Sequence, residues 1–479
     1  MMKATLQGAV LLGLLAVSLP SYAEVQNIKI GGDITVRAFH RENLDLRADG
    51  AATGVASVPL DDEDNFFMTT TGINIGADLT ENVSAFVRLA SERDWDADNG
   101  NTAAADFDLS QAYITLKELF YSPLTVRIGQ QPIVWGRGFV LGSNLLGSII
   151  LGTSLQDRNA SIAANEYTDF TAFDAIRATL DLSNVGGLNL PLTADYVYIK
   201  SDENSRGAHD DINIQGINFS TKVDTAASEF ETYYLNKRDK SDADLDPENG
   251  NVNTWGVRGS AQPVEGSYLY SELAYQWGTL GADLEGVIDA GKTQSAWAAN
   301  LGGEYTFAQA TTTPKVGAEW RFYSGEYLPD VGAIIGWDPV APGYFRTAIR
   351  EFQTRSTLGT AFYAVDQTGV TSGQTNQHEL ALYGGLVPME DLSLNTRLAW
   401  FLLDEEALQP QSSPREKFIG TEWDTQLLYN YTDDVQFGLL YALFLPGSVF
   451  RNGGSGGGNV TVTGDATAQQ IVTTVSVKF

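Results

Sequence analysis

The chain has 479 residues, and its 60 acidic and 30 basic side chains give a formal net charge of −30 at pH 7. This acidic balance excludes a nucleic-acid-binding protein, because such proteins carry a basic surface. The sequence has no cysteine and only three histidines, which excludes a disulfide scaffold, a thiolate metal site and a cysteine nucleophile.

The first 23 residues have the pattern of a secretory signal peptide. Lys3 is followed by an apolar stretch over 9–19 and by the small-residue cleavage site Ser21-Tyr22-Ala23. We therefore expect cleavage near Ala23 and a mature chain spanning 24–479. No later run of 18 apolar residues occurs, so a membrane protein with this sequence must be a closed β-barrel.

From residue 27 onward, apolar and polar residues alternate with period two. In the first such segment, Ile34 and Val36 alternate with Asp33, Thr35 and Arg37, and the same pattern recurs up to the terminal Phe479. Segments of about 10–13 residues are long enough to cross a bilayer at a tilt. We predict strands at 27–40, 66–79, 83–93, 107–118, 124–133, 169–182, 190–201, 211–222, 228–238, 253–263, 267–278, 294–306, 314–325, 376–387, 391–403, 420–432, 435–446 and 468–479.

The connections between these segments alternate between short and long. Short turns such as 80–82 and 433–434 alternate with long connections such as 134–168 and 326–375. Short periplasmic turns and long external loops are typical of outer-membrane barrels. The fold class expected is therefore all-β: a transmembrane antiparallel β-barrel of about 18 strands with long extracellular loops, forming one domain over 24–479. We expect it in the bacterial outer membrane, in contact with lipid and lipopolysaccharide, as a monomer because its outward faces are uniformly apolar.

Two of the long loops are unusual. The loop over 134–168 is apolar, and we expect it to fold inward and narrow the lumen, because such a loop is unfavourable in water. Packing against a neighbouring protomer is the alternative. The loop over 326–375 is the longest connection, and it is either a lid or a region with short additional strands.

Many acidic residues lie in the predicted loops. Asp94, Asp96 and Asp98 have the spacing of calcium ligands, but glycine falls at the seventh position and no glutamate at the twelfth, so this is not an EF-hand. A solvated acidic surface is the simpler interpretation. A divalent-cation site beside the lipopolysaccharide is the alternative, and we expect no other metal and no cofactor.

Strand parity predicts which charged side chains face the lumen. Setting the apolar face outward places these seven arginines inward: Arg37, Arg88, Arg127, Arg177, Arg258, Arg321 and Arg397. Rings of arginine select anions, and a guanidinium binds a carboxylate in a bidentate manner. Alternatively, each arginine pairs with an inward acid, such as Asp33, Asp195, Glu319 or Glu379, and braces the wall. Arg127 and Arg137 flank the apolar loop and are the predicted constriction.

Three parts of the sequence resemble the alginate-export type of outer-membrane channel. They are the opening strand 28–37, the strand 126–131 followed by Trp135-Gly-Arg-Gly138, and the strand 318–325 followed by Trp337-Asp-Pro339 and Gly343-Tyr-Phe345. The resemblance implies a monomeric barrel that exports an anionic uronic-acid polymer past an arginine-rich constriction. The chain departs from the family pattern at Gln130, Glu326 and Arg137, which concerns the identity of the polymer rather than the channel.

We therefore expect a channel that passes a hydrophilic, anionic, uronic-acid-like saccharide through an arginine-lined lumen. A general diffusion porin is the first alternative, and a surface adhesin or a barrel enzyme is the second. An enzyme is not expected, because no H-E-x-x-H motif occurs and the three histidines, His40, His209 and His378, are widely separated. The formal phosphate-loop match over 286–293 is followed by a strand pattern rather than a helix.

Overall fold

The computed structural model describes residues 27–44, 46, 63–95, 107–121, 123–143, 167–183, 191–202, 212–239, 250–279, 293–325, 333–334, 336–343, 345–351, 375–405, 416–451, 454–456, 460–462 and 466–479. The predicted signal peptide and its cleavage site at Ala23 lie outside the described residues. In the described part of the chain, no helix is long and apolar enough to span a membrane.

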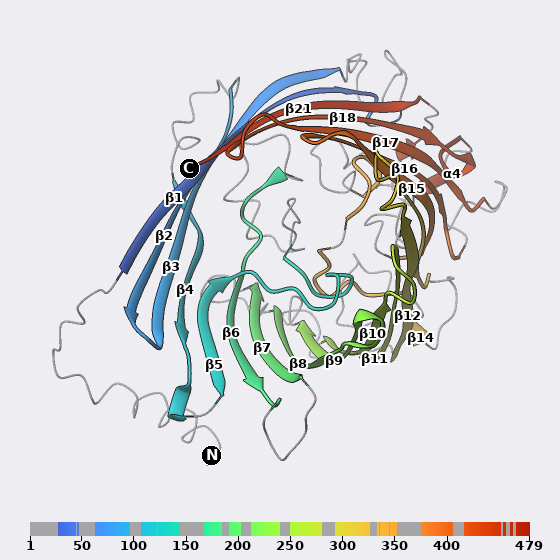
Figure 1. The fold of residues 1–479 in the computed structure, drawn as a ribbon. Helices are drawn as coiled ribbons and strands as arrows, with labels where there is room; N and C mark the ends of the chain where they lie inside the picture. Colours follow the sequence, from blue (N-terminus) through green and yellow to red (C-terminus); the bar gives the residue numbers. More distant parts are fainter. Residues whose placement is uncertain are drawn as a thin grey trace.

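The described residues form a closed ring of eighteen antiparallel strands (Figure 1). The strands are β1 (Asn27–Glu42), β2 (Asp64–Thr80), β3 (Val83–Asp94), β4 (Asp108–Leu116), β5 (Leu124–Gln131), β6 (Phe173–Asp181), β7 (Leu192–Asp202), β8 (Ile212–Val223), β9 (Ser228–Asp239), β10 (Gly250–Ala261), β11 (Ser267–Thr279), β12 (Thr293–Thr306), β13 (Lys315–Tyr323), β15 (Gln377–Met389), β16 (Leu392–Leu402), β17 (Phe418–Asn430), β18 (Val435–Pro446) and β21 (Ala468–Lys478). These match the eighteen predicted segments within a few residues at each end.

The first and last strands close the barrel. Val36 of β1 lies opposite Thr69 of β2 on one side and opposite Val475 of β21 on the other. The predicted fold class is therefore confirmed. The connection 326–375 does contain an additional strand, because β14 (Ala333–Ile334) pairs in parallel with the start of β12. Outside the ring, β19 (Gly454–Gly456) pairs with β20 (Val460–Val462), and the short helix α4 (Ser448–Arg451) follows β18.

The two faces of the wall differ as parity predicts. On the outer face, large apolar side chains are exposed, for example Ile30 at 73%, Leu382 at 55% and Val316 at 54%. By contrast, the inward-facing Glu319 and Arg397 are buried. An outer surface of exposed apolar side chains is stable only in lipid, because in water it would be an aggregation-prone patch.

The buried apolar residues lie inside the barrel, near the strand ends that adjoin the long connections. Val197 and Ile199 of β7, Phe401 of β16 and Phe444 of β18 are examples. Parts of the chain between β5 and β6 and between β13 and β15 run inside the ring of strands (Figure 1). The long connections therefore supply part of an interior core, and the lumen narrows where they enter it.

Candidate functional site: the lumen and its two inward segments

The first inward segment, residues 134–143, follows β5 and packs against the inner wall. Trp135, Phe139 and Leu141 are each at most 2% exposed and belong to one buried cluster with Val197 and Ile199. Trp135 Nε1 donates a hydrogen bond to Asp195 Oδ2 at 2.8 Å. The expected inward fold of the apolar loop is confirmed for these residues, whereas 144–166 lie outside the described residues.

The second inward segment consists of residues 336–343 and 345–351. It crosses the first segment inside the barrel: Gly142 N donates to Ala341 O at 2.9 Å, and Gly343 N donates to Gly138 O at 2.8 Å. The two backbones lie close together at Gly142, where a Cβ would lie 3.4 Å from the Cα of Gly343 and 2.8 Å from the Cα of Gly138 within the first segment itself. Gly138 itself has a φ of +80°, which favours glycine. The two loops therefore form one hydrogen-bonded constriction.

Five consecutive backbone amides of the second inward segment, those of residues 346–350, all donate to carboxylates. Arg346 N and Thr347 N donate to Glu351, and Ala348 N donates to Asp424 Oδ2 at 3.2 Å. The remaining two, of residues 349 and 350, donate to Glu422 at 2.7 and 2.8 Å. Because a charged acceptor strengthens a hydrogen bond, wall carboxylates of β17 hold this segment against the barrel.

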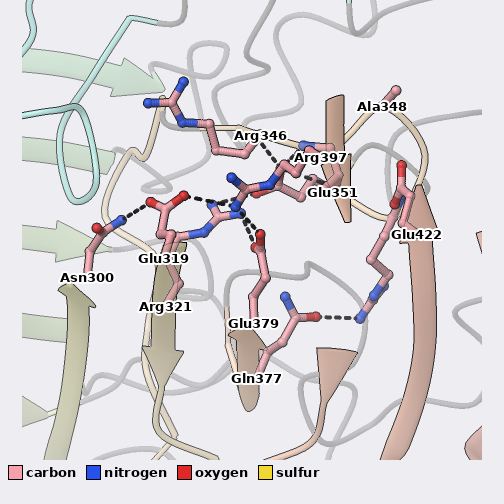
Figure 2. A network of polar contacts seen from close by, with 12 residues as sticks. Asn300, Glu319, Arg321, Arg346, Ala348, Glu351, Gln377, Glu379, Arg397 and Glu422 are labelled. Carbon is pink, nitrogen blue, oxygen red and sulfur yellow. Dashed lines mark hydrogen bonds and ion pairs between the residues drawn. The ribbon is translucent and has the colours of Figure 1, made fainter. Parts of the chain in front are cut away.

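An ion-pair cluster connects three wall strands with the same segment (Figure 2). Arg321 of β13 pairs with Glu351 at 2.6 Å and with Glu379 of β15. Arg397 of β16 pairs with Glu319 at 2.8 Å and also with Glu379. All five side chains are at most 10% exposed, and each arginine has two carboxylate partners, so the arginine charges are compensated within the cluster.

Three further predicted arginines are paired in the same way. Arg88 bridges Asp33 and Asp169, each at 2.8 Å. Arg177 pairs with Asp195 at 2.9 Å. Arg258 pairs with Glu231 at 2.7 Å and with Glu229 at 3.2 Å. These three arginines therefore fit the alternative stated above, in which an arginine pairs with an inward acid and braces the barrel wall.

The other three predicted arginines contact aromatic rings. The guanidinium carbon of Arg37 lies 4.8 Å from the ring centre of Tyr167, that of Arg127 lies 4.5 Å from Tyr113, and that of Arg137 lies 3.7 Å from Tyr270. A cation over a ring face is favourable and leaves the charge in place. Tyr167 lies at the end of the first loop, and burial raises the pKa of its phenol, so it stays neutral.

A lumen cavity of about 540 Å³ lies beside the two inward segments. Its cationic lining residues are Arg137, Lys315, Arg346 and Arg397, and its acidic ones are Glu304, Glu319 and Asp424. Aromatic side chains also line it: Tyr167, Tyr268, Tyr270, Phe345 and Tyr383. Of the two residues predicted for the constriction, Arg137 lines this cavity and Arg127 does not.

The sequence interpretation missed the tyrosines of the cavity and Arg346. Tyr268 and Tyr270 share a strand face with the inward Glu272, so parity was a usable signal for them. No such signal existed for Arg346, because its loop has no periodic pattern. For the calcium candidate, Asp94 is buried at the end of β3, while Asp96 and Asp98 lie outside the described residues. The described residues contain no group of three possible metal ligands.

The family model described as alginate export matches residues 60–462, which is most of the chain. The chain belongs to the alginate-export family. No curated protein sequence matches it significantly.

Solved structures similar to this alginate-export barrel are porins and channels. One is OccK2 (OpdF) of Pseudomonas aeruginosa in complex with glucuronate, with a TM-score of 0.52, 11% identity, and coverage of 94% of this chain and 98% of that one. Another is a BenF-like porin of Pseudomonas fluorescens Pf-5, with a TM-score of 0.53, 10% identity, and coverage of 95% and 99%. At these identities the likeness establishes the fold. Together with the family, it places the protein in a bacterial outer membrane.

Two of the segments that resembled the alginate-export family lie in the constriction. Trp135-Gly-Arg-Gly138 is the turn of the first inward segment, and Trp337-Asp-Pro339 opens the second. Asp338 pairs with Lys237 of β9 at 3.0 Å, and Gln276 donates to Asp338 O at 2.7 Å. The family resemblance therefore includes residues that narrow the lumen as well as strands of the wall.

Proposed function

We propose that this barrel passes an anionic, uronic-acid-like saccharide through its lumen, and that the cavity beside the inward segments selects it. The observation that carries this proposal is the composition of the cavity lining. Apart from the Arg397–Glu319 ion pair, three cationic side chains (Arg137, Lys315 and Arg346) and two acidic ones (Glu304 and Asp424) line it, in a chain whose acids outnumber its bases 60 to 30. The tyrosines of the lining add surfaces that suit a sugar ring.

Five of the predicted lumen arginines are neutralised by carboxylates, so they contribute little to selection. Arg137 and Arg346 also line the cavity, and the proposed selection depends above all on Lys315. Within the described part of the chain, no carboxylate lies within ion-pair distance of Lys315. An unneutralised cation at a narrow, partly desolvated site attracts anions more strongly than a paired one.

The test is a planar lipid bilayer containing the purified barrel under a salt gradient. We expect an anion-selective reversal potential and block by uronic-acid oligomers, with glucuronate as the smallest probe, since that ligand was bound by the structurally similar OccK2. Lys315→Gln and Arg137→Gln should each lower anion selectivity. Arg127→Gln is the matched control, because Arg127 makes the same charge change without lining the cavity.

Cation selectivity without block by the oligomers would overturn the proposal and leave a general diffusion porin. An equal loss of selectivity in all three variants would show that the whole lumen, rather than this cavity, sets the preference. Binding of the oligomers without any conductance would favour the adhesin.

A further inference from the structure

Two tyrosines of the cavity lie over glycines of the neighbouring strand. A Cβ on Gly302 of β12 would lie 2.3 Å from Cζ of Tyr270, and a Cβ on Gly317 of β13 would lie 2.3 Å from Cζ of Tyr383. Both rings therefore occupy space that the side chain of any residue larger than glycine at position 302 or 317 would fill. The missing side chains let the rings lie against the wall instead of projecting across the lumen.

Cationic groups approach these rings from within the cavity. The guanidinium carbon of Arg137 lies 3.7 Å from the ring centre of Tyr270, and that of Arg397 lies 5.7 Å from the ring centre of Tyr383. Tyr268 is half-buried, and its ring centre lies 5.8 Å from that of Tyr270. The cavity thus combines aromatic surfaces with positive charges along β11 to β16.

From this arrangement we infer that Tyr268 and Tyr383 form a stacking surface for the sugar rings of the transported saccharide. This inference rests on the proposed function and adds that the cavity recognises the ring of the sugar as well as its charge. One face of a pyranose consists of C–H groups, and burying that face on an aromatic ring removes apolar surface from water. The hydroxyl and carboxylate groups at the rim of the sugar then reach Arg137 and Lys315.

The stacking surface makes a prediction that charge selection alone does not make. A neutral oligosaccharide of the same ring size and length should also block the channel, more weakly than the uronic-acid oligomer. Both sugars should lose affinity when a tyrosine is removed, since both bury the same C–H face. The loss in each case should be about three- to tenfold per tyrosine, the range expected for one aromatic contact.

The experiment measures the block constants of a uronic-acid oligomer and of a neutral oligosaccharide on the same channels. Tyr383→Leu and Tyr268→Leu should weaken both constants by a similar factor, and Tyr383→Phe, which keeps the ring, should behave like the unmodified protein. Tyr305→Leu is the matched control, because Tyr305 of β12 is 40% exposed on the outer face. Tyr268→Leu keeps the test possible if Tyr383→Leu fails to form a barrel, since Tyr268 does not rest on a glycine.

Unchanged block constants in both leucine variants would overturn the stacking surface and leave the proposed function intact if reversal potentials remain anion-selective. The opposite result is that only the neutral sugar blocks the channel, that this block depends on the tyrosines, and that the reversal potential is cation-selective. It would support the stacking surface and remove the preference for anionic saccharides.

Discussion

Nη1 of Arg321 lies 2.6 Å from Oε1 of Glu351, and this ion pair, whose side chains are 3% and 2% exposed, joins the wall to the second inward segment. Arg321 belongs to β13, whereas Glu351 comes from the long connection that follows it. The same Glu351 accepts two backbone amides of its own segment. One carboxylate therefore shapes the loop and attaches it to the barrel.

Replacing Glu351 by glutamine should destabilise the constriction. The neutral amide leaves Arg321 with Glu379 as its carboxylate partner, and a buried pair broken on one side typically costs about 3–5 kcal/mol. Because Glu379 remains, we expect the free energy of unfolding in denaturant to fall by the lower end of that range. We also expect a higher single-channel conductance. Lys222→Gln, which removes a cation whose side chain is 80% exposed, should leave the unfolding midpoint unchanged. Equal midpoints for the two variants would contradict the anchoring role of Glu351.

The crossing of the two inward segments depends on Gly142. In Gly142→Ala the new Cβ would meet the Cα of Gly138 in the same segment at 2.8 Å and the Cα of Gly343 in the second segment at 3.4 Å. The turn of the first segment must therefore widen, and the second segment must shift by a few tenths of an ångström. Overpacking of this kind costs about 1–3 kcal/mol. We expect a larger and noisier conductance in bilayer recordings. Gly76→Ala is the control, because a Cβ there has no atom within 4 Å. Identical conductance in both variants would mean that the crossing does not limit the current.

Trp135→Phe tests the hydrogen bond that fixes the first inward segment. The change removes the Nε1 donor to Asp195, which keeps Arg177 and Thr179 as partners. Loss of a buried hydrogen bond to a charged group costs about 1–3 kcal/mol, measurable as a lower unfolding midpoint. The same change at Trp255, whose ring is 52% exposed and whose Nε1 bonds Thr232, should have a smaller effect. A larger effect at Trp255 would argue against the buried contact.

The paired arginines should have little influence on ion selectivity. The double variant Arg177→Gln with Asp195→Asn removes both charges of one pair and leaves the net charge of the lumen unchanged. We expect its reversal potential to match that of the unmodified channel, in contrast to Lys315→Gln. A clear loss of anion selectivity in the double variant would show that Arg177 acts on the permeating ion despite its partner.

The barrel itself was predictable because its signal is local. Each strand carries its own alternation, so an outward Leu382 and an inward Arg321 are identifiable from their immediate neighbours in sequence. Parity also placed the acids Asp195, Glu319 and Glu379 on the same inner face as the arginines. Parity does not give the distances between the arginines and these acids. It therefore does not show which arginine forms an ion pair with which acid.

The strand number, the two faces of each strand and the inward direction of the apolar loop were thus predictable from the order of residues alone, since a period of two and an apolar composition act within single segments. The three-dimensional fold was needed to show that Arg137 lines the cavity while Arg127 does not, and that Arg321 pairs with Glu351. It also decided that Tyr383 rests on Gly317. These contacts join residues far apart in the chain, and their formation depends on barrel closure and on the paths of loops that have no repeating pattern.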